Sequence, residues 1–212
     1  MRKMFLVATV SLMFANATMA DGGKNELVLI NKSTNTYIDA HEVTVGDWCL
    51  FLEFYKKVFS EKPQKYADFL PNHEICTKAY GSENYLTDSK YRNYPMVGIT
   101  YQQMKMYCGW RTDNVNKELQ SKKSKQQYIY SLPEEADLQA AYDLQSDKNP
   151  KTGLRAVDEN AKTVTGIIDN AQEMTQNKKV VTGVTVYGLR FENVSEPSAL
   201  VGFRCKCVIN NL

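Results

Sequence analysis

The segment from residue 94 to residue 111 constrains the fold of this chain more than any other part of the sequence. A short apolar run ends at Thr100, and Gln103 follows three positions later, which is the spacing of a helix-capping box. After Thr100, apolar residues recur every three to four positions, so the pattern predicts a helix that ends near Leu119. Cys108 lies at about the second turn of this expected helix, on the same face as the apolar residues.

Short segments of mixed type surround this helix. A second helix is expected to begin at Val45, because Thr44 can cap it and Asp47 places an acidic group in its first turn. The other expected elements are strands at 26–30, 36–43, 128–130 and 202–209, a strand or extended segment at 94–99, weak alternation over 179–189, and a helix from Glu135 to about Leu144 behind a capping box of Ser131 and Glu134. Residues 60–93 and 146–160 lack a clear period. The sequence therefore predicts an α+β fold with much irregular structure in one domain.

Residues 1–20 have the features of a secretory signal peptide. Two basic residues are followed by an apolar stretch at residues 4–14, and small residues lead to Ala20. The apolar stretch is shorter than the roughly 20 residues that a membrane-spanning helix needs. We therefore expect cleavage after Ala20, with Ala17 as the alternative site, a single domain formed by residues 21–212 without a membrane span, and a secreted or periplasmic location.

The expected mature domain carries no formal net charge. The whole chain has 26 Lys and Arg residues against 24 Asp and Glu residues, and the signal peptide removes two of the basic residues and none of the acidic ones. Nucleic-acid-binding domains present a basic surface, so this balance argues against a nucleic-acid partner. The basic cluster at residues 122–125 has no interleaved aromatic residues and is expected to be a solvated loop.

All five cysteines follow the expected cleavage site, and an exported chain meets an oxidising environment that favours disulfides. Because their number is odd, at least one thiol is free or pairs with another molecule. Cys205 and Cys207 lie too close together for a zinc site, and no second pair accompanies them. If the chain is an enzyme that uses a thiol, Cys76 and Cys207 are the candidates.

Five motifs follow one another along nearly the whole mature chain. They are Glu42-Val-Thr44, Tyr94-Pro-Met-Val-Gly-Ile-Thr-Tyr-Gln-Gln103 with Tyr107-Cys-Gly-Trp110, Ser131-Leu-Pro-Glu-Glu-Ala-Asp-Leu138, Asp169-Asn-Ala-Gln-Glu-Met-Thr175 and Gly202-Phe-Arg-Cys205. In this order and spacing they resemble the motifs of the formylglycine-generating-enzyme family, also called the sulfatase-modifying factor domain family. Residues 91–95 and 110–112 are most similar to the branch found in gliding-motility and type IX secretion lipoproteins of Bacteroidetes, although the chain lacks their lipobox cysteine and is short for them.

The resemblance implies a fold related to that of C-type lectins, with little regular secondary structure. It also implies a disulfide, because in family members a cysteine at the position of Cys108 bonds the cysteine of the last motif, here Cys205. Such a bond would close a loop of about a hundred residues and would contribute about 4–5 kcal/mol in the chain-entropy description. The family gives no pairing for Cys49, Cys76 or Cys207.

The residues that carry the family's chemistry are missing from this sequence. The oxidase members bind copper through two cysteines in the region that corresponds to residues 180–200, which here contains neither cysteine nor histidine. Thiolates are the ligands that a soft copper ion selects, and the Thr, Val and Tyr present cannot replace them. The sulfoxide-synthase relatives bind iron through three histidines, whereas this chain has only His41 and His73, both expected to be structural or exposed. No catalytic residue is therefore assigned.

A calcium ion bound near the fourth motif is a further feature of the family. The matching ligand positions are Asp169, Ala171 and Glu173, and oxygen ligands of this kind suit calcium. A family asparagine seven residues before Glu173 is replaced by Gly166, so one side-chain ligand is absent. Asp169 stands in place of a family glycine, so its carboxylate offers a compensating ligand. The alternative is a loop closed without metal by hydrogen bonds from Asn170 and Glu173, and we favour this alternative.

The sequence therefore predicts an exported, non-catalytic domain that acts in binding or assembly at the bacterial envelope, with a protein or a glycan as its partner. Residues 60–93 and 146–163 are the expected contact surface, because they are irregular and the first of them is rich in tyrosine. Two alternatives stay open. One is an enzyme of the same family, either formylglycine-generating or using Cys76 or Cys207. The other is a carbohydrate-binding module, by analogy with lectins alone.

Overall fold

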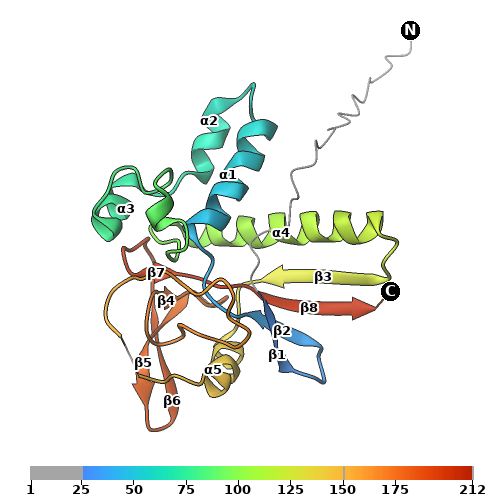
Figure 1. Cartoon of the computed structure of the whole chain (residues 1–212), viewed down its shortest axis with the longest axis vertical. Coiled ribbons are helices and arrows are strands. Elements are labelled where there is room, and N and C mark those ends of the chain that lie inside the picture. Colours follow the sequence, from blue (N-terminus) through green and yellow to red (C-terminus); the bar gives the residue numbers. More distant parts are fainter. Residues whose placement is uncertain (1–25, 150, 212) are drawn as a thin grey trace.

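The fold is a mixed arrangement of helices and short strands, seen in a computed structural model that describes residues 26–149 and 151–211 (Figure 1). The expected signal peptide at residues 1–20 lies outside the described residues. Within the described ranges, no helix is both long enough and apolar enough to cross a membrane. The α+β class predicted from the sequence is confirmed, since helices and mostly antiparallel strands fall largely in separate stretches of one domain.

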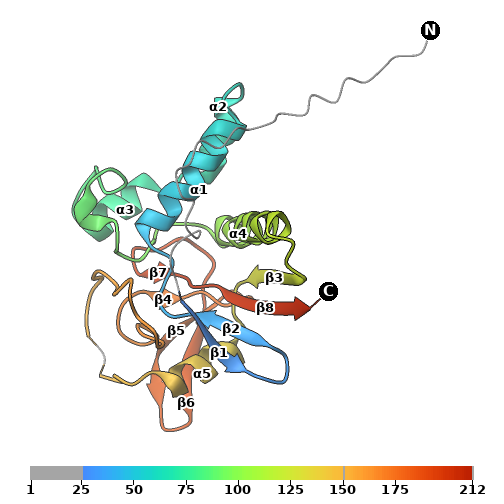
Figure 2. The same ribbon diagram turned by 45° about the vertical axis from the view of Figure 1, so that its right-hand side comes forward.

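The main sheet has four strands, which are all antiparallel to their neighbours. Their order is β1 (Leu27–Asn31), β2 (Thr36–Asp39), β8 (Lys206–Asn211) and β3 (Gln126–Ser131). The last strand of the chain thus lies inside the sheet, between two strands from its first and middle thirds. The long helix α4 (Tyr101–Ser121) runs along β3 and β8 in both views (Figure 2).

The other elements lie on either side of this sheet and helix. One end of the molecule is helical. It contains the helices α1 (Val45–Val58), α2 (Pro63–Tyr66) and α3 (His73–Tyr80) and the 3-10 turns η1 (Ala67–Phe69) and η2 (Ser89–Tyr91). The other end consists of one helix and two pairs of strands. These are the helix α5 (Glu135–Leu144), the parallel pair β4 (Gln172–Glu173) and β7 (Val201–Gly202), and the hairpin of β5 (Lys179–Thr185) and β6 (Gly188–Asn193).

Both predicted capping boxes at the starts of α1 and α4 are confirmed. The Asp47 amide donates to the Thr44 hydroxyl at 3.1 Å, and the Asp47 carboxylate accepts the Thr44 amide at 2.8 Å. Thr100 and Gln103 exchange the same two hydrogen bonds, at 3.1 and 2.8 Å. The Gln103 amide group also donates to the Leu70 carbonyl at 2.8 Å, so the cap fixes the neighbouring loop as well as the helix.

An aromatic core joins the two capped helices to the end of the chain. The Trp48 ring of α1 stacks on the Tyr107 ring of α4 with 5.8 Å between centroids. Phe203 meets Tyr107 edge-on at 5.4 Å, and all three side chains are buried. Aromatic pairs of this geometry add to the free energy gained by burying their area. Cys108, expected on the apolar face of α4, is buried beside this aromatic core.

Three expectations about secondary structure are wrong in detail. Ser131 belongs to β3, where it pairs with Lys206, so the capping box of α5 is formed by Glu134 and Asp137 one turn later. By contrast, residues 94–99 are extended, as one of the two expected forms, with an isolated bridge between Pro95 and Thr44. The predicted strand at 36–43 ends early, at Asp39, and the predicted strand at 202–209 is divided into β7 and β8. Both changes occur where the backbone meets the buried polar network around Arg204.

Candidate ligand-binding site

The Arg204 side chain is the centre of a buried polar network, which divides the closing strand. Its guanidinium donates through Nε and Nη2 to both oxygens of Glu173, at 2.7 and 2.6 Å. Its Nη1 donates to the carbonyls of Asp39 and Ala40 at 2.9 and 3.0 Å. Arg204 and Glu173 are both 0% exposed. The backbone between β7 and β8 accepts hydrogen bonds from the Val43 and Asp39 amides, both at 2.9 Å, and places the Arg204 guanidinium in the core.

A second buried ion pair lies beside the first. Arg111 of α4 donates to the Asp39 carboxylate at 2.6 Å, and the Cys205 amide donates to the same oxygen at 3.0 Å. The Arg111 guanidinium also lies 4.2 Å from the centre of the Tyr130 ring. Asp39, the last residue of β2, pairs with Leu27 of β1 and also contacts both arginines, Arg111 through its carboxylate and Arg204 through its carbonyl.

Glu42, from the first motif, faces the fourth motif across this network. One of its oxygens, Oε1, accepts the Ala171 amide at 3.4 Å, and the other, Oε2, lies 3.9 Å from Nη2 of Arg204. Glu42 is 0% exposed, and this burial raises the pKa of its carboxyl group to about 8, against the lowering effect of Arg204. Gly166 lies against it, since a Cβ there would be 2.7 Å from Oε2. This close approach explains why no asparagine stands at position 166.

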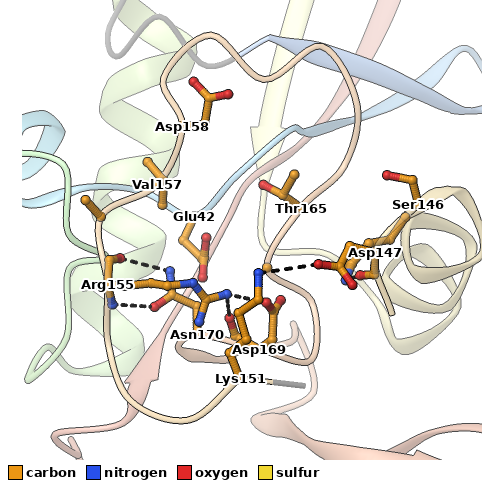
Figure 3. Close-up of a pocket in the computed structure, with 13 residues that line it drawn as sticks. Glu42, Ser146, Asp147, Lys151, Arg155, Val157, Asp158, Thr165, Asp169 and Asn170 are labelled. Atoms are coloured by element: carbon orange, nitrogen blue, oxygen red, sulfur yellow. Dashed lines mark hydrogen bonds and ion pairs between the residues drawn. The ribbon is translucent and has the colours of Figure 1, made fainter. Parts of the chain in front are cut away.

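The Glu42 carboxyl group forms the inner wall of a polar cavity of about 230 Å³ (Figure 3). Residues of the irregular segment after α5 form most of its lining. Arg155 reaches across to Asp169, donating to both the carbonyl and the carboxylate of that residue. At the rim, Lys151 pairs with Asp147 at 3.4 Å. Part of the predicted contact surface at residues 146–163 therefore lines the cavity.

Two buried oxygens of the cavity have no donor among the described residues. These atoms are Oε2 of Glu42 and Oδ1 of Asp169. The Nη1 group of Arg155 likewise has no acceptor. Buried polar atoms in folded proteins are almost always hydrogen-bonded, and Asp39 Oδ1 and Arg111 Nε of the neighbouring ion pair share this lack of a partner among the described residues.

Glu42 makes the stability of the protein depend on pH. Its folded-state pKa of about 8 lies above the ordinary value of 4.5, so the folded protein keeps a proton that the unfolded chain releases. The contribution of Glu42 to the stability is therefore fully present below about pH 4.5 and is lost as the pH rises through about 8. We expect Glu42→Gln to flatten this dependence and to raise the free energy of unfolding at pH 8 by on the order of a few kcal/mol.

Urea unfolding at several pH values measures this effect. Glu118→Gln is the matched control, because Glu118 is an exposed carboxylate that pairs with Lys122 across one helical turn. The control should follow the wild type at every pH. An unfolding curve for Glu42→Gln that keeps the full wild-type pH dependence would contradict the assignment.

The residues of the implied calcium site are close together but do not fit a metal ion. Both oxygens of Glu173 are bonded to Arg204, and Asp169 is bonded to Arg155, so two guanidinium groups occupy the ligand positions. The described ranges contain no group of three or more His, Cys, Asp or Glu side chains placed to hold a metal. The alternative expectation is a loop closed by hydrogen bonds from Asn170 and Glu173. Such bonds are present, since Asn170 Oδ1 accepts the Arg155 amide at 2.9 Å.

The cysteines expected to pair lie next to each other in the core. The sulfur atoms of Cys108 and Cys205 are 3.6 Å apart, which is farther than the roughly 2.05 Å of a covalent bond. Both residues are buried, and burial raises the pKa of the Cys205 thiol well above its usual range. The structure brings together the two residues that the resemblance implied, and the disulfide itself stays a prediction.

The candidate reactive thiols lie in the core instead of a cleft. Cys76 and Cys207 are both 0% exposed, and desolvation raises the pKa of their thiols to about 11 and about 12. A reactive cysteine needs an accessible thiolate with a lowered pKa, and neither residue has one. Cys207 lies in β8 and Cys76 in α3, so the described thiols do not fit a copper-binding pair in the region of the β5–β6 hairpin.

The two histidines match their expected structural or exposed roles. His41 is buried, with Nδ1 hydrogen-bonded at 2.8 Å to the Glu42 carbonyl, and His73 is exposed at the start of α3. Sequence reasoning missed Arg155 and the role of Glu42. Glu42 and Arg204 stand in quoted motifs, but only the fold shows that these motifs meet.

Comparison with known proteins identifies the family. The model of the sulfatase-modifying factor enzyme 1-like domain matches residues 30–193, which include Glu42 and the whole cavity and end before Arg204. No curated protein matches the chain. The family match covers most of the sequence, and the mixed helix and strand architecture agrees with it. The chain therefore belongs to the sulfatase-modifying factor enzyme 1-like domain family.

Proposed function

We propose that this chain is a non-catalytic member of its family that acts in binding or assembly. The observation that carries the proposal is the state of its thiols, because the family's oxidase chemistry depends on cysteine. Each of Cys76, Cys205 and Cys207 is 0% exposed with a raised pKa, and Cys49 donates to the Leu86 carbonyl at 3.3 Å. A chain with these groups keeps the scaffold of the family and lacks its nucleophile.

We further propose that the protein is exported and works at the bacterial envelope. The signal-peptide features of residues 1–20 support export. The similarity of residues 91–95 to the gliding-motility and type IX secretion branch supports a role in assembly at the cell surface, and a relation to lectin folds supports a glycan as the partner. The cavity between Glu42 and Asp169, of about 230 Å³, is a candidate place for a small partner group.

A thiol alkylation map tests the non-catalytic proposal. Reduced, folded protein is treated with iodoacetamide at pH 7, and the modified cysteines are quantified by mass spectrometry over time. Cys49, the only half-buried cysteine of the five, serves as the internal control and should react first. We expect Cys76 and Cys207 to react at least a hundredfold more slowly than a free thiol. Rapid modification of either residue would favour a thiol enzyme.

A further inference from the structure

We propose that two copies of this chain pair through their β1 strands, so that their two four-stranded sheets become one continuous sheet. In the main sheet, β1 is the edge strand at one side and β3 is the edge strand at the other (Figure 1). An edge strand leaves a row of backbone N–H and C=O groups unpaired by its own sheet, and such a row is a template for another strand. The pairing goes beyond the proposed function and does not depend on it, because an enzyme and a binding domain can both dimerise in this way.

The β3 edge of the sheet is closed by side chains of α4. The Asn116 side chain accepts the Tyr128 amide at 2.9 Å and donates to the Tyr128 carbonyl at 2.7 Å. One turn earlier in the helix, the Thr112 hydroxyl accepts the Tyr130 amide at 2.9 Å. These side chains take the place of a neighbouring strand, so β3 does not offer its edge to another chain.

The β1 edge is open by comparison. The Glu26 carbonyl accepts the Ala40 amide at 2.9 Å, so the backbone groups of Glu26 face the β2 side. Because successive residues of an antiparallel strand direct their backbone groups to opposite sides, those of Leu27 and Leu29 point away from β2. In the part of the chain that the structure describes, no hydrogen bond closes these outward groups. The Leu29 side chain is 41% exposed, so this edge lies at the surface and another chain can reach it.

The sequence of β1 suits a second copy of itself. Leu27-Val28-Leu29 reads the same in both directions, so antiparallel pairing about Val28 sets Leu27 opposite the partner subunit's Leu29. Both leucines have outward backbone groups, so each such pair can exchange its N–H···O bonds. Residues 27–30 are all apolar and include neither the lysine nor the proline that commonly protects an edge. The irregularity of β1 falls between Leu29 and Asn31, beyond the segment that pairs.

The charges at the two ends of β1 are complementary in the same register. Glu26 precedes the strand, and Lys32 follows it at the start of the turn that leads to β2. Antiparallel pairing about Val28 places Glu26 diagonally across from the partner subunit's Lys32, within reach of two long side chains. Glu26 contacts Lys162 at 2.8 Å, but its side chain is still 49% exposed, so it can accept a second cation.

Sedimentation equilibrium of the purified protein, expressed as the full chain, measures the pairing. We expect a monomer and a dimer in equilibrium, with a dissociation constant in the micromolar range because the paired surface is small. Hydrogen exchange resolved at single amides locates the contact. The Leu27 and Leu29 amides should exchange at least tenfold more slowly in the dimer than in the monomer, whereas the Val28 amide faces β2 and should exchange slowly in both.

Two variants of Leu29 test the pairing without breaking a hydrogen bond of the monomer. Leu29→Lys removes the leucine contact and brings two like charges close to the dimer axis, and Leu29→Pro removes the outward amide. Each should weaken dimerisation at least tenfold. Val184→Lys is the matched control, because Val184 is an apolar residue of strand β5 with a similar exposure of 44%, and it should leave the affinity within twofold of the wild type. A thermal melt of each variant confirms that it is folded.

The outcomes are decisive in either direction. A dimer that protects the Leu27 and Leu29 amides and is weakened by both Leu29 variants supports the pairing. A protein that stays monomeric at high micromolar concentration overturns it, and so does a dimer that both variants leave intact. Slow exchange of the two amides in the monomer would place another segment of the same chain on the β1 edge, and this result also overturns the pairing.

Discussion

Replacing Arg204 with methionine is expected to lower the free energy of unfolding by about 3–5 kcal/mol, because it leaves buried carboxylates without their partner. The guanidinium makes hydrogen bonds to both oxygens of Glu173 and to the carbonyls of Asp39 and Ala40, all in the core. Methionine fills much of the same volume and offers no donor. Since domains of this size are stable by only about 5–15 kcal/mol, the variant should unfold at much lower urea concentration or fail to fold.

The matched control is Arg190→Met, because Arg190 pairs with Glu192 at 3.3 Å on the surface, with both side chains 58% exposed. Exposed pairs of this kind contribute about 0–1 kcal/mol, so this variant should unfold close to the wild type. Adding Glu173→Gln to Arg204→Met should recover part of the loss, since it removes one unpaired charge. Equal stability of Arg204→Met and Arg190→Met would show that the network contributes nothing.

Oxidation of Cys108 and Cys205 is expected to stabilise the protein by up to about 4–5 kcal/mol. The two residues are 97 positions apart in sequence, and cross-linking a loop of that length removes conformational freedom from the unfolded chain. Their sulfur atoms already lie 3.6 Å apart in the folded protein, so the bond needs little rearrangement. Unfolding in urea with and without reductant should therefore show a large difference in midpoint.

Cys108→Ser should abolish the effect of the reductant, because it removes one partner of the bond. Cys76→Ser is the control, since Cys76 is equally buried but donates to the Val97 carbonyl and lies in another part of the core. It should lower stability under both conditions and keep the difference between them. A difference that persists in Cys108→Ser, or a mass map that joins other cysteines, would contradict the pairing.

The local features of the fold could be predicted from sequence because neighbouring residues determine them. The caps of α1 and α4 each depend on a hydroxyl and an acceptor three positions later, and the structure has both pairs. The start of α5 could not be assigned in the same way. Ser131 matches the capping pattern, but pairing of β3 with β8 places it in the sheet, and Glu134 caps the helix instead.

The cavity could not be predicted from sequence because it is assembled from distant segments. Glu42 lies 129 positions from Ala171, whose amide it accepts, and Arg155 approaches Asp169 from an irregular segment with no periodic pattern. The motif Gly-Phe-Arg-Cys is typical of the family, but the sequence does not show which carboxylates its arginine contacts. The division of the predicted strand at 202–209 into β7 and β8 lies at the contact of Arg204 with Glu173. It could not be predicted because the two residues come from separate motifs.

We propose that this protein keeps the scaffold of its family without the oxidase reaction. The most direct test incubates the purified protein, supplied with copper and oxygen, with a peptide that carries a sulfatase-type cysteine, followed by mass spectrometry and an aldehyde-specific hydrazide label. An active family member treated in parallel should convert the peptide. We expect this protein to leave the cysteine unchanged and the label unincorporated. Appearance of the aldehyde above the level of the peptide alone would contradict the claim.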